Sequence, residues 1–221
     1  PFFNNVAMWP AGSIFSSVNE LSRFVIALLN DGQLDGKQVL SPSVSAKLMG
    51  QYTSMPGDVN VHYGYGLMNF EERGVRVVLH GGFSRGYGSM IQMSPEHRFA
   101  VIVQTNRSGE TLPKTRAKAM ELFLPLKATE AEKEKKLLPL SATDAANFAG
   151  QYRNGPQSWE IINKDGKLYL KQEADELALT RSGPLRLSYG ASLENELVFV
   201  ADAGGKIKYL FDGLYSARKI P

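Results

Sequence analysis

Between residues 63 and 106 the apolar residues recur with the two-residue period of β-strands, and this pattern constrains the fold more than any other feature of the chain. Runs rich in β-branched and aromatic residues predict strands over residues 63–70, 75–80, 87–94 and 99–105. Two of the connecting segments, 72–74 and 95–98, are short and contain Gly or Pro, which is typical of tight turns. Because tight turns join antiparallel neighbours, the sequence predicts an antiparallel meander.

Helical patterns flank this meander on both sides. Ser17 and Glu20 have the spacing of a capping box, apolar residues then follow at helical spacing over 21–29, and the Asn-Asp-Gly at 30–32 predicts the end of that helix. Ser41 and Pro42 predict the start of a second helix, which should end near Gly50. Residues 114–124 predict a third helix that covers one face of the sheet. The first part of the chain is therefore predicted to be α+β.

The remainder of the chain has a different organisation. Residues 127–136 are highly charged and poor in apolar residues, as segments that connect domains often are. After them come short strand patterns separated by Gly or Asp/Asn turns, which predict a small antiparallel β-barrel or sandwich. We therefore expect a domain over residues 1–126, a charged linker over 127–139 and a small β-barrel domain over 140–221.

Composition excludes several classes of function. The 221 residues carry a formal net charge of only +3 with scattered lysines, which argues against a nucleic-acid partner and favours a small-molecule one. The chain has no cysteine, and its three histidines are dispersed, so we expect neither a metal site nor a cofactor. No apolar run approaches the roughly 18 residues of a membrane span, and no signal-peptide pattern is present.

The glycine-dense stretch 79–89 is predicted to be the edge of an active site. His80 would stand at the end of a strand, and Gly81 and Gly82 follow it directly. Glycines lack the Cβ atoms that keep backbone N–H groups away from a ligand. The alternative is a structural histidine that is hydrogen-bonded at a strand end.

Three other patterns resemble parts of nucleophilic sites, and we interpret them as accidental. Ser84 lies in a Gly-x-Ser-x-Gly sequence, but a strand pattern rather than a helix follows it, so a hydrolase that uses Ser84 remains a minor alternative. Ser216 and Lys219 have the serine-x-x-lysine spacing at the C-terminal end, after a β-rich stretch. Tyr152 and Asn154 form a Tyr-x-Asn sequence, but an Asn-Gly pair after a strand is an ordinary turn signal.

The order of several motifs is similar to that in the C-terminal half of the serine β-lactamase-related hydrolases. This family contains class C β-lactamases, penicillin-binding proteins, D-aminopeptidases and β-lactamase-like esterases. The motifs are Pro-Ala-Gly-Ser at 10–13, Glu-Leu-Ser-Arg-Phe at 20–24, Tyr-Gly-Tyr-Gly-Leu at 63–67, His-Gly-Gly at 80–82 and Val-Ile-Val-Gln-Thr-Asn at 101–106. The resemblance implies that His80, Gly81 and Gly82 are a variant of the family's third active-site motif. It also implies that His80 orients or polarises the substrate or the serine-lysine-tyrosine network. The N–H of Phe83 would then be one of two oxyanion-hole donors.

The same resemblance implies what would complete the site. The catalytic serine, the lysine and a Tyr-x-Asn motif precede this region in the family, so we expect a fragment that is inactive by itself. Its partners would be an amide or ester substrate and the missing N-terminal half, and the truncated sheet also predicts self-association. The substrate would be a β-lactam, a D-amino-acid peptide or an ester, and the parent protein would be periplasmic or secreted.

The later part of the chain resembles the lipocalin-like β-domain that often accompanies this hydrolase family. The similarity rests on the opening phrase Phe-Ala-Gly-Gln-Tyr-Arg-Asn at 148–154. Aromatic residues in this part would either fill the core of a barrel or line a ligand cavity. A second hypothesis is therefore a non-catalytic binding module, whose barrel holds an apolar ligand or docks a partner.

Overall fold

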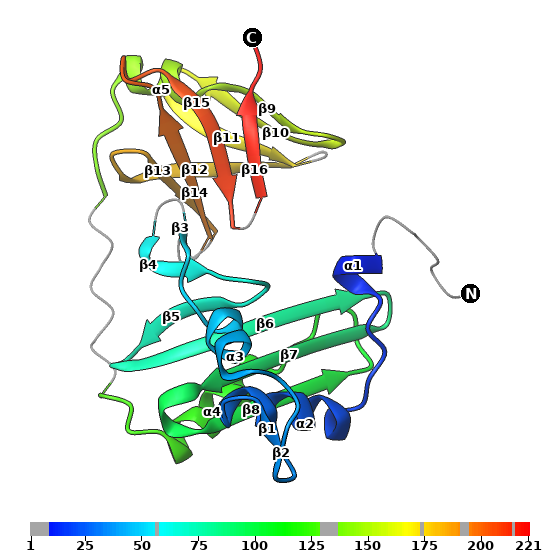
Figure 1. Cartoon of the computed structure of the whole chain (residues 1–221). Helices are drawn as coiled ribbons and strands as arrows, with labels where there is room; N and C mark the ends of the chain where they lie inside the picture. Colours follow the sequence, from blue (N-terminus) through cyan, green and yellow to red (C-terminus); the bar gives the residue numbers. More distant parts are fainter. Residues whose placement is uncertain (1–8, 56–57, 129–136, 173–174, 191–194, 214) are drawn as a thin grey trace. The chain divides into compact units, whose positions relative to one another are not determined.

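The computed structural model describes residues 9–55, 58–128, 137–172, 175–190, 195–213 and 215–221 (Figure 1). The described residues divide into two compact units. The first lies within residues 1–54 and 60–129, and the second within residues 55–59 and 130–221. Each unit is described by itself below.

The first unit contains most of a six-stranded sheet with the order β3-β4-β5-β6-β7-β8, of which Met55, Asp58 and Val59 are assigned to the second unit. Neighbouring strands from β4 to β8 pair antiparallel, as the meander prediction requires. The strands are β3 (Thr53–Met55), β4 (Asp58–Tyr63), β5 (Met68–Glu72), β6 (Val75–Ser84), β7 (Tyr87–Ser94) and β8 (Phe99–Thr105). The other elements are α1 (Trp9–Gly12), α2 (Val18–Leu29), a small hairpin of β1 (Gln33–Leu34) and β2 (Lys37–Gln38), α3 (Pro42–Leu48), a 3-10 turn (Pro95–His97) and α4 (Pro113–Phe123).

Apolar residues cover both faces of this sheet. On one face, Val25 and Leu28 of α2 pack with Val78 of β6 and Met93 of β7. On the other face, the apolar side of α4 packs with Val75, Val77 and their neighbours. Successive residues of a strand point to opposite faces, so Val77 and Val78 contribute to different layers. The predicted α+β architecture with flanking helices is confirmed.

The helix starts that flank the sheet follow from local side-chain chemistry. The Ser17 hydroxyl accepts a hydrogen bond from the Glu20 N–H at 3.2 Å, and the Glu20 carboxylate accepts one from the Ser17 N–H at 3.1 Å. The Ser41 hydroxyl accepts a hydrogen bond from the Val44 N–H at the start of α3, and Pro42 occupies the first helical position, where a missing N–H has no cost. Asp31 (φ 52°) and Gly32 (φ 85°) end α2 in the left-handed region, as the Asn-Asp-Gly sequence predicts.

The prediction of one strand over residues 63–70 is wrong. A turn interrupts it, and β4 ends at Tyr63 while β5 begins at Met68. Gly66 has a φ of 80°, which is strained for other residues. A Cβ atom on Gly64 would lie 2.4 Å from the carbonyl oxygen of Gly50. The two glycines thus serve a turn that contacts another segment, which the apolar periodicity of 63–70 does not reveal.

The prediction that a strand ends at His80 is also wrong. Strand β6 continues to Ser84, and the turn consists of Arg85 and Gly86 alone. Gly86 has a positive φ of 82°, whereas Gly81 and Gly82 pair in register with Met90 and Ser89. The glycines at 81 and 82 therefore belong to an extended strand, and His80 lies within the strand rather than at its end.

The second unit is a closed antiparallel barrel of eight strands, β9 to β16, in which β16 pairs with β9. The predicted small β-barrel is thereby confirmed. Its strands are β9 (Gly150–Asn154), β10 (Gln157–Lys164), β11 (Lys167–Gln172), β12 (Asp175–Gly183), β13 (Arg186–Tyr189), β14 (Asn195–Ala201), β15 (Ile207–Asp212) and β16 (Tyr215–Lys219).

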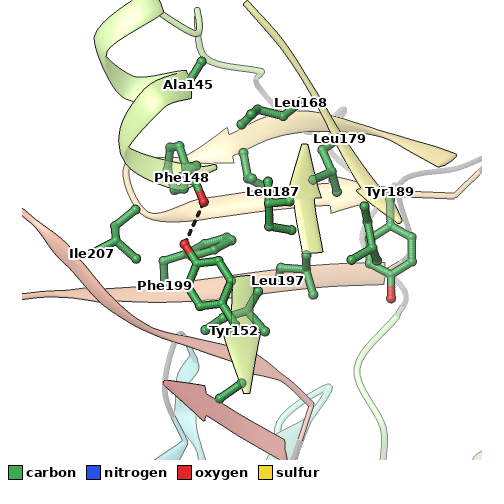
Figure 2. Packing of buried hydrophobic residues seen from close by; sticks show 14 residues of the cluster. Ala145, Phe148, Tyr152, Leu168, Leu179, Leu187, Tyr189, Leu197, Phe199 and Ile207 are labelled. Atoms are coloured by element: carbon green, nitrogen blue, oxygen red, sulfur yellow. Dashed lines mark hydrogen bonds between the residues drawn. The ribbon is translucent and has the colours of Figure 1, made fainter. Parts of the chain in front are cut away.

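Fourteen buried residues fill the interior of this barrel (Figure 2). Phe199 contacts Phe148 and Tyr152 in edge-to-face geometry, with ring centroids 4.9 and 5.8 Å apart. Phe148 belongs to a short helix, α5 (Ala142–Phe148). In this part of the chain only strands are predicted from the sequence, and this helix is missed. Its local signal is a capping box formed by Ser141 and Asp144.

The charged linker predicted over 127–139 lies mostly outside the described residues, because 129–136 are not described. The predicted domain boundaries therefore remain predictions.

Among the described helices, none has both the length and the apolar character needed to cross a membrane.

Candidate functional site

The predicted site residues lie where strand β6 extends past its neighbour β5. Strands β5 and β6 are paired from the turn, where Glu72 is opposite Val75, to the start of β5, where Met68 is opposite Leu79. Strand β6 then continues for the five residues 80–84, and among the described residues these pair only with β7. Within that part of the chain, one side of this segment is therefore an open strand edge, of the kind that can pair with an added strand.

The register determines which backbone groups face the open side. In a hairpin with a two-residue turn, the closing pair exchanges hydrogen bonds and the next pair does not. Ser84 and Tyr87 close the β6–β7 hairpin, so the N–H and C=O groups of Phe83 and Gly81 point away from β7. The β5–β6 turn leads independently to the same assignment, because it places Leu79 in a hydrogen-bonded pair with Met68. The open edge thus presents the backbone groups of Gly81 and Phe83, about 6.6 Å apart at the rise of a strand.

His80 lies beside this edge on the face of the sheet that α2 covers. It shares this face with Val78, two residues earlier, and it pairs with Ile91, which packs against the cluster beneath α2. The His80 side chain is exposed, and no hydrogen bond joins it to another residue in the described part of the chain. The structure thus supplies no hydrogen-bond partner that would explain His80 as a structural histidine.

The residues after His80 keep the open edge uncovered. Gly81 and Gly82 have no side chains, and the Phe83 side chain is 79% exposed on the opposite face from His80. The approach to the backbone of Gly81 and Phe83 is therefore sterically open among the described residues.

A loop formed by residues 105–112 braces the β6–β7 hairpin. The Gly86 N–H donates to the Ser108 hydroxyl at 2.7 Å. The Thr105 hydroxyl donates to the Glu110 carbonyl at 2.8 Å. A Cβ atom on Gly88 would lie 2.1 Å from that same carbonyl oxygen, so only glycine fits there. Sequence reasoning missed these bracing residues because the contacts join separate segments and leave no local pattern.

The three patterns interpreted as accidental have no catalytic geometry. Ser84 ends β6 and is followed by a turn and a strand, without the helix of a nucleophile elbow. Ser216 and Lys219 lie three apart in β16, so they point to opposite faces, and Lys219 donates to the Asn147 carbonyl at 2.6 Å. The Tyr152 hydroxyl is buried and donates to the Phe148 carbonyl at 2.6 Å, and burial raises the pKa of Tyr152.

The described residues contain no group of three or more His, Asp or Glu side chains that could hold a metal ion. A polar depression elsewhere in the first unit contains none of the predicted site residues, and its lining residues are Asn30, Asp31, Gln33, Asp35, Gly36 and Arg98.

The open edge of β6 can bind an extended main chain and donate N–H groups to a carbonyl oxygen. No Ser-x-x-Lys sequence occurs in residues 1–128, so this unit lacks the nucleophile pattern that would act on such a carbonyl.

Comparisons with known proteins agree with this architecture. A family model described as Beta-lactamase matches residues 2–124. Two crystal structures of SurE match the fold, and one of them is described with D-Leu. The structure with D-Leu has a TM-score of 0.65 at 15% sequence identity, and the match covers 89% of this chain and 49% of that chain. The other has a TM-score of 0.64 at 16% identity, and the match covers 89% of this chain and 47% of that chain. The octameric penicillin-binding protein homologue from Pyrococcus abyssi matches at a TM-score of 0.44 and 21% identity, over 92% of this chain and 47% of that one. The chain thus spans about half the length of these solved structures. No curated protein sequence matches it.

Proposed function

The chain belongs to the β-lactamase family, and we propose that its first unit is the substrate-binding side of a serine hydrolase site that acts through an acyl-enzyme. The observation that carries this proposal is the five-residue open edge of β6, which presents the backbone groups of Gly81 and Phe83. The substrate main chain would lie along this edge as an added strand.

In this proposal the Phe83 N–H stabilises the charge that develops on the substrate carbonyl. When a serine attacks an amide or ester, the carbonyl oxygen becomes an oxyanion and needs donors in fixed positions. The Phe83 N–H is held by the register of β6 and faces the open side, so it meets that requirement without rearrangement. Removal of one such donor costs about 3 kcal/mol, which corresponds to roughly a hundredfold in rate.

His80 would act on the other side of the same edge. It is exposed on the face that α2 covers, one residue from the Gly81 backbone groups. From there it can donate or accept a hydrogen bond with the substrate or with the proton-transfer groups of the nucleophile. The nucleophilic serine, its lysine and a tyrosine would come from a part of the family domain that residues 9–128 do not include. We therefore expect the 221-residue chain to be inactive by itself.

Three substrate classes remain candidates: β-lactams, D-amino-acid peptides and esters. Because one of the SurE structures is described with D-Leu, amides of D-amino acids are the first substrates to assay. The pocket that distinguishes these classes would depend on residues from both parts of the site.

Covalent labelling tests the proposal. The 221-residue chain and the same chain extended at its N-terminus are treated with a fluorophosphonate probe, and the intact masses are measured. We expect one adduct on the extended chain, at a serine that precedes Pro1, and none on the shorter chain. An adduct on Ser84 of the shorter chain would support a nucleophile-elbow hydrolase, and no adduct on either chain would contradict the proposal.

Two substitutions at Phe83 separate the backbone donor from the side chain. Phe83→Pro in the extended chain removes the N–H that faces the open side, so no bond to β7 is lost. We expect labelling about a hundredfold slower, by the oxyanion-donor cost. Phe83→Ala keeps the N–H and removes only an exposed ring, so it should label at nearly the normal rate. Equal rates for the two variants would show that this N–H is not an oxyanion donor.

The alternative function, a barrel that holds an apolar ligand or docks a partner, remains a separate hypothesis. Fourteen buried side chains occupy the barrel interior, so an apolar ligand would have to displace them. This filling favours the catalytic proposal. Saturable binding of an apolar ligand that persists in His80→Ala would favour the alternative.

A further inference from the structure

The end of the barrel opposite α5 contains a carboxylate on the inner face. Asp212 is the last residue of β15, and its register partner on β14 is the fully buried Leu197. Leu210, two residues earlier on β15, is also fully buried. Because side chains alternate along a strand, Asp212 shares the inner face with Leu210. Its side chain is half-buried, so solvent still reaches it.

Trp159 fixes the position of this carboxylate. The indole Nε1–H donates to Asp212 Oδ2 at 2.9 Å. Trp159 is in register with the fully buried Tyr152, and it packs against the barrel core. Strands β9 and β16 lie between β10 and β15 in the barrel order, so this hydrogen bond spans the interior rather than joining neighbouring strands.

Tyr189 supplies a second aromatic ring near the same carboxylate. It is the last residue of β13 and is 9% exposed, and Figure 2 shows it at the edge of the core cluster, away from α5. Burial, and then the negative charge of Asp212, raise the pKa of Tyr189. Its hydroxyl therefore stays protonated and uncharged at neutral pH.

Asp212 is half-buried at the end of the barrel, and it differs from most of the other described carboxylates of the barrel because it has no cationic partner. Five of them form ion pairs with lysine or arginine, namely Asp144, Glu160, Glu176, Glu196 and Asp202. Within the part of the chain that the structure describes, no lysine or arginine forms an ion pair with Asp212. The inward-facing cations Arg181 and Lys219 interact with Asp144 and the Asn147 carbonyl at the α5 end. A half-buried carboxylate that only a neutral donor satisfies is suited to a cation from outside.

We propose that this end of the barrel binds a primary ammonium group, with Asp212 as its counter-ion and the rings of Trp159 and Tyr189 beside it. Oδ2 of Asp212 is bonded to Trp159, which leaves Oδ1 to accept from the ammonium. Aromatic faces add attraction for a cation that has been partly removed from water. This site lies in the second unit, and it is independent of the acyl-transfer proposal for β6.

Tryptophan fluorescence provides the test, because the chain contains only two tryptophans. Trp9→Phe leaves Trp159 as the sole reporter, and this variant is titrated with n-hexylammonium, 1-hexanol and hexanoate. D-Leucinamide in a further titration distinguishes an α-ammonium of an amino-acid amide from an alkylammonium. We expect a saturable change with one or both ammonium compounds, and none with the alcohol or the carboxylate.

Asp212→Asn distinguishes a carboxylate that binds a ligand from one that serves only as the hydrogen-bond acceptor of Trp159. The Asn oxygen can still accept from the Trp159 N–H, but the charge is lost, so we expect at least tenfold weaker ammonium binding. The matched control is Asp165→Asn, which removes the same charge at an exposed turn position and should bind normally. Unchanged affinity in Asp212→Asn, or equal binding of 1-hexanol, would overturn the proposal, as would no saturable change with either ammonium compound.

If Asp212→Asn lowers the melting temperature of the barrel, Tyr189→Leu takes its place. Removal of this ring should weaken ammonium binding severalfold while the core remains apolar, and unchanged affinity would then contradict the proposal. Neither readout involves acylation, so failure here is distinguishable from failure of the hydrolase proposal.

Discussion

The two units treat the edges of their sheets in opposite ways. The barrel closes on itself, so each of its eight strands has two neighbours. In the first unit, β6 passes the end of β5, and no strand in the described part of the chain pairs with the other side of residues 80–84. An open edge has backbone groups that water must satisfy, and it invites pairing with other chains. The barrel thus uses the backbone groups of its strand edges for stability, whereas the backbone groups of residues 80–84 on the open side are the ones that we propose to bind a substrate.

Side-chain burial follows the same division. Phe199 in the barrel is 2% exposed, whereas Phe83 on the open edge is 79% exposed. The two phenylalanines have the same apolar surface, but only Phe199 contributes that surface to a core. The comparison therefore makes quantitative predictions about stability.

The largest expected effect is the loss of a core ring from the closed barrel. Phe199→Ala removes edge-to-face contacts with Phe148 and Tyr152 and leaves a cavity, so the free energy of unfolding should fall by about 3–5 kcal/mol. Phe83→Ala should change it by less than about 0.5 kcal/mol. Urea unfolding of the 221-residue chain with Trp9→Phe, followed by Trp159 fluorescence, measures the barrel, and circular dichroism follows both units. A cost for Phe83→Ala near that of Phe199→Ala would show that the edge ring is packed in solution.

The next effect concerns the brace behind the open edge. Gly88→Ala places a Cβ atom 2.1 Å from the Glu110 carbonyl oxygen, so the hairpin and the 105–112 loop must separate. We expect a cost of about 1–3 kcal/mol, seen as faster amide hydrogen exchange in the hairpin.

Gly82→Ala is the matched control for that substitution. Its Cβ would meet only the Ser89 hydroxyl, at 3.1 Å, which a side-chain rotation can relieve. Exchange in the hairpin should therefore change less than in Gly88→Ala. Similar exchange rates in the two variants would indicate that the loop does not brace the hairpin.

Much of the fold could be predicted from the sequence because its signals are local. The capping box of Ser17 and Glu20, the turn at 73–74 and the alternation of apolar residues each depend on neighbours in the chain. Predictions failed where a distant segment decides the conformation. Gly64 lies against the Gly50 carbonyl, and Gly81 is extended because β7 pairs with it. A glycine count cannot distinguish a turn from a strand that lacks side chains.

The candidate site was accessible to sequence reasoning only in part. Glycine density and family resemblance point to His80, Gly81, Gly82 and Phe83, whose catalytic roles remain proposals. The open edge could not be predicted, because it depends on β5 beginning at Met68 rather than earlier. The position of Asp212 opposite Trp159 was equally inaccessible, since 53 residues separate them and the closure of the barrel brings them together.

The smallest predicted effect concerns acid and the α5 cap of the barrel. A hydrogen bond from the Ser141 hydroxyl lowers the pKa of Asp144 below its usual 3.8, and Arg181 adds a smaller contribution. Because the folded-state pKa is depressed, this carboxylate stabilises the barrel above its unfolded pKa. That stability is lost as the pH falls through the folded value. Between about pH 5 and 2, Asp144→Asn should therefore flatten the pH dependence of the melting temperature. The exposed Asp165→Asn serves as the control, and the same flattening there would indicate general charge repulsion rather than the Ser141 and Arg181 contacts.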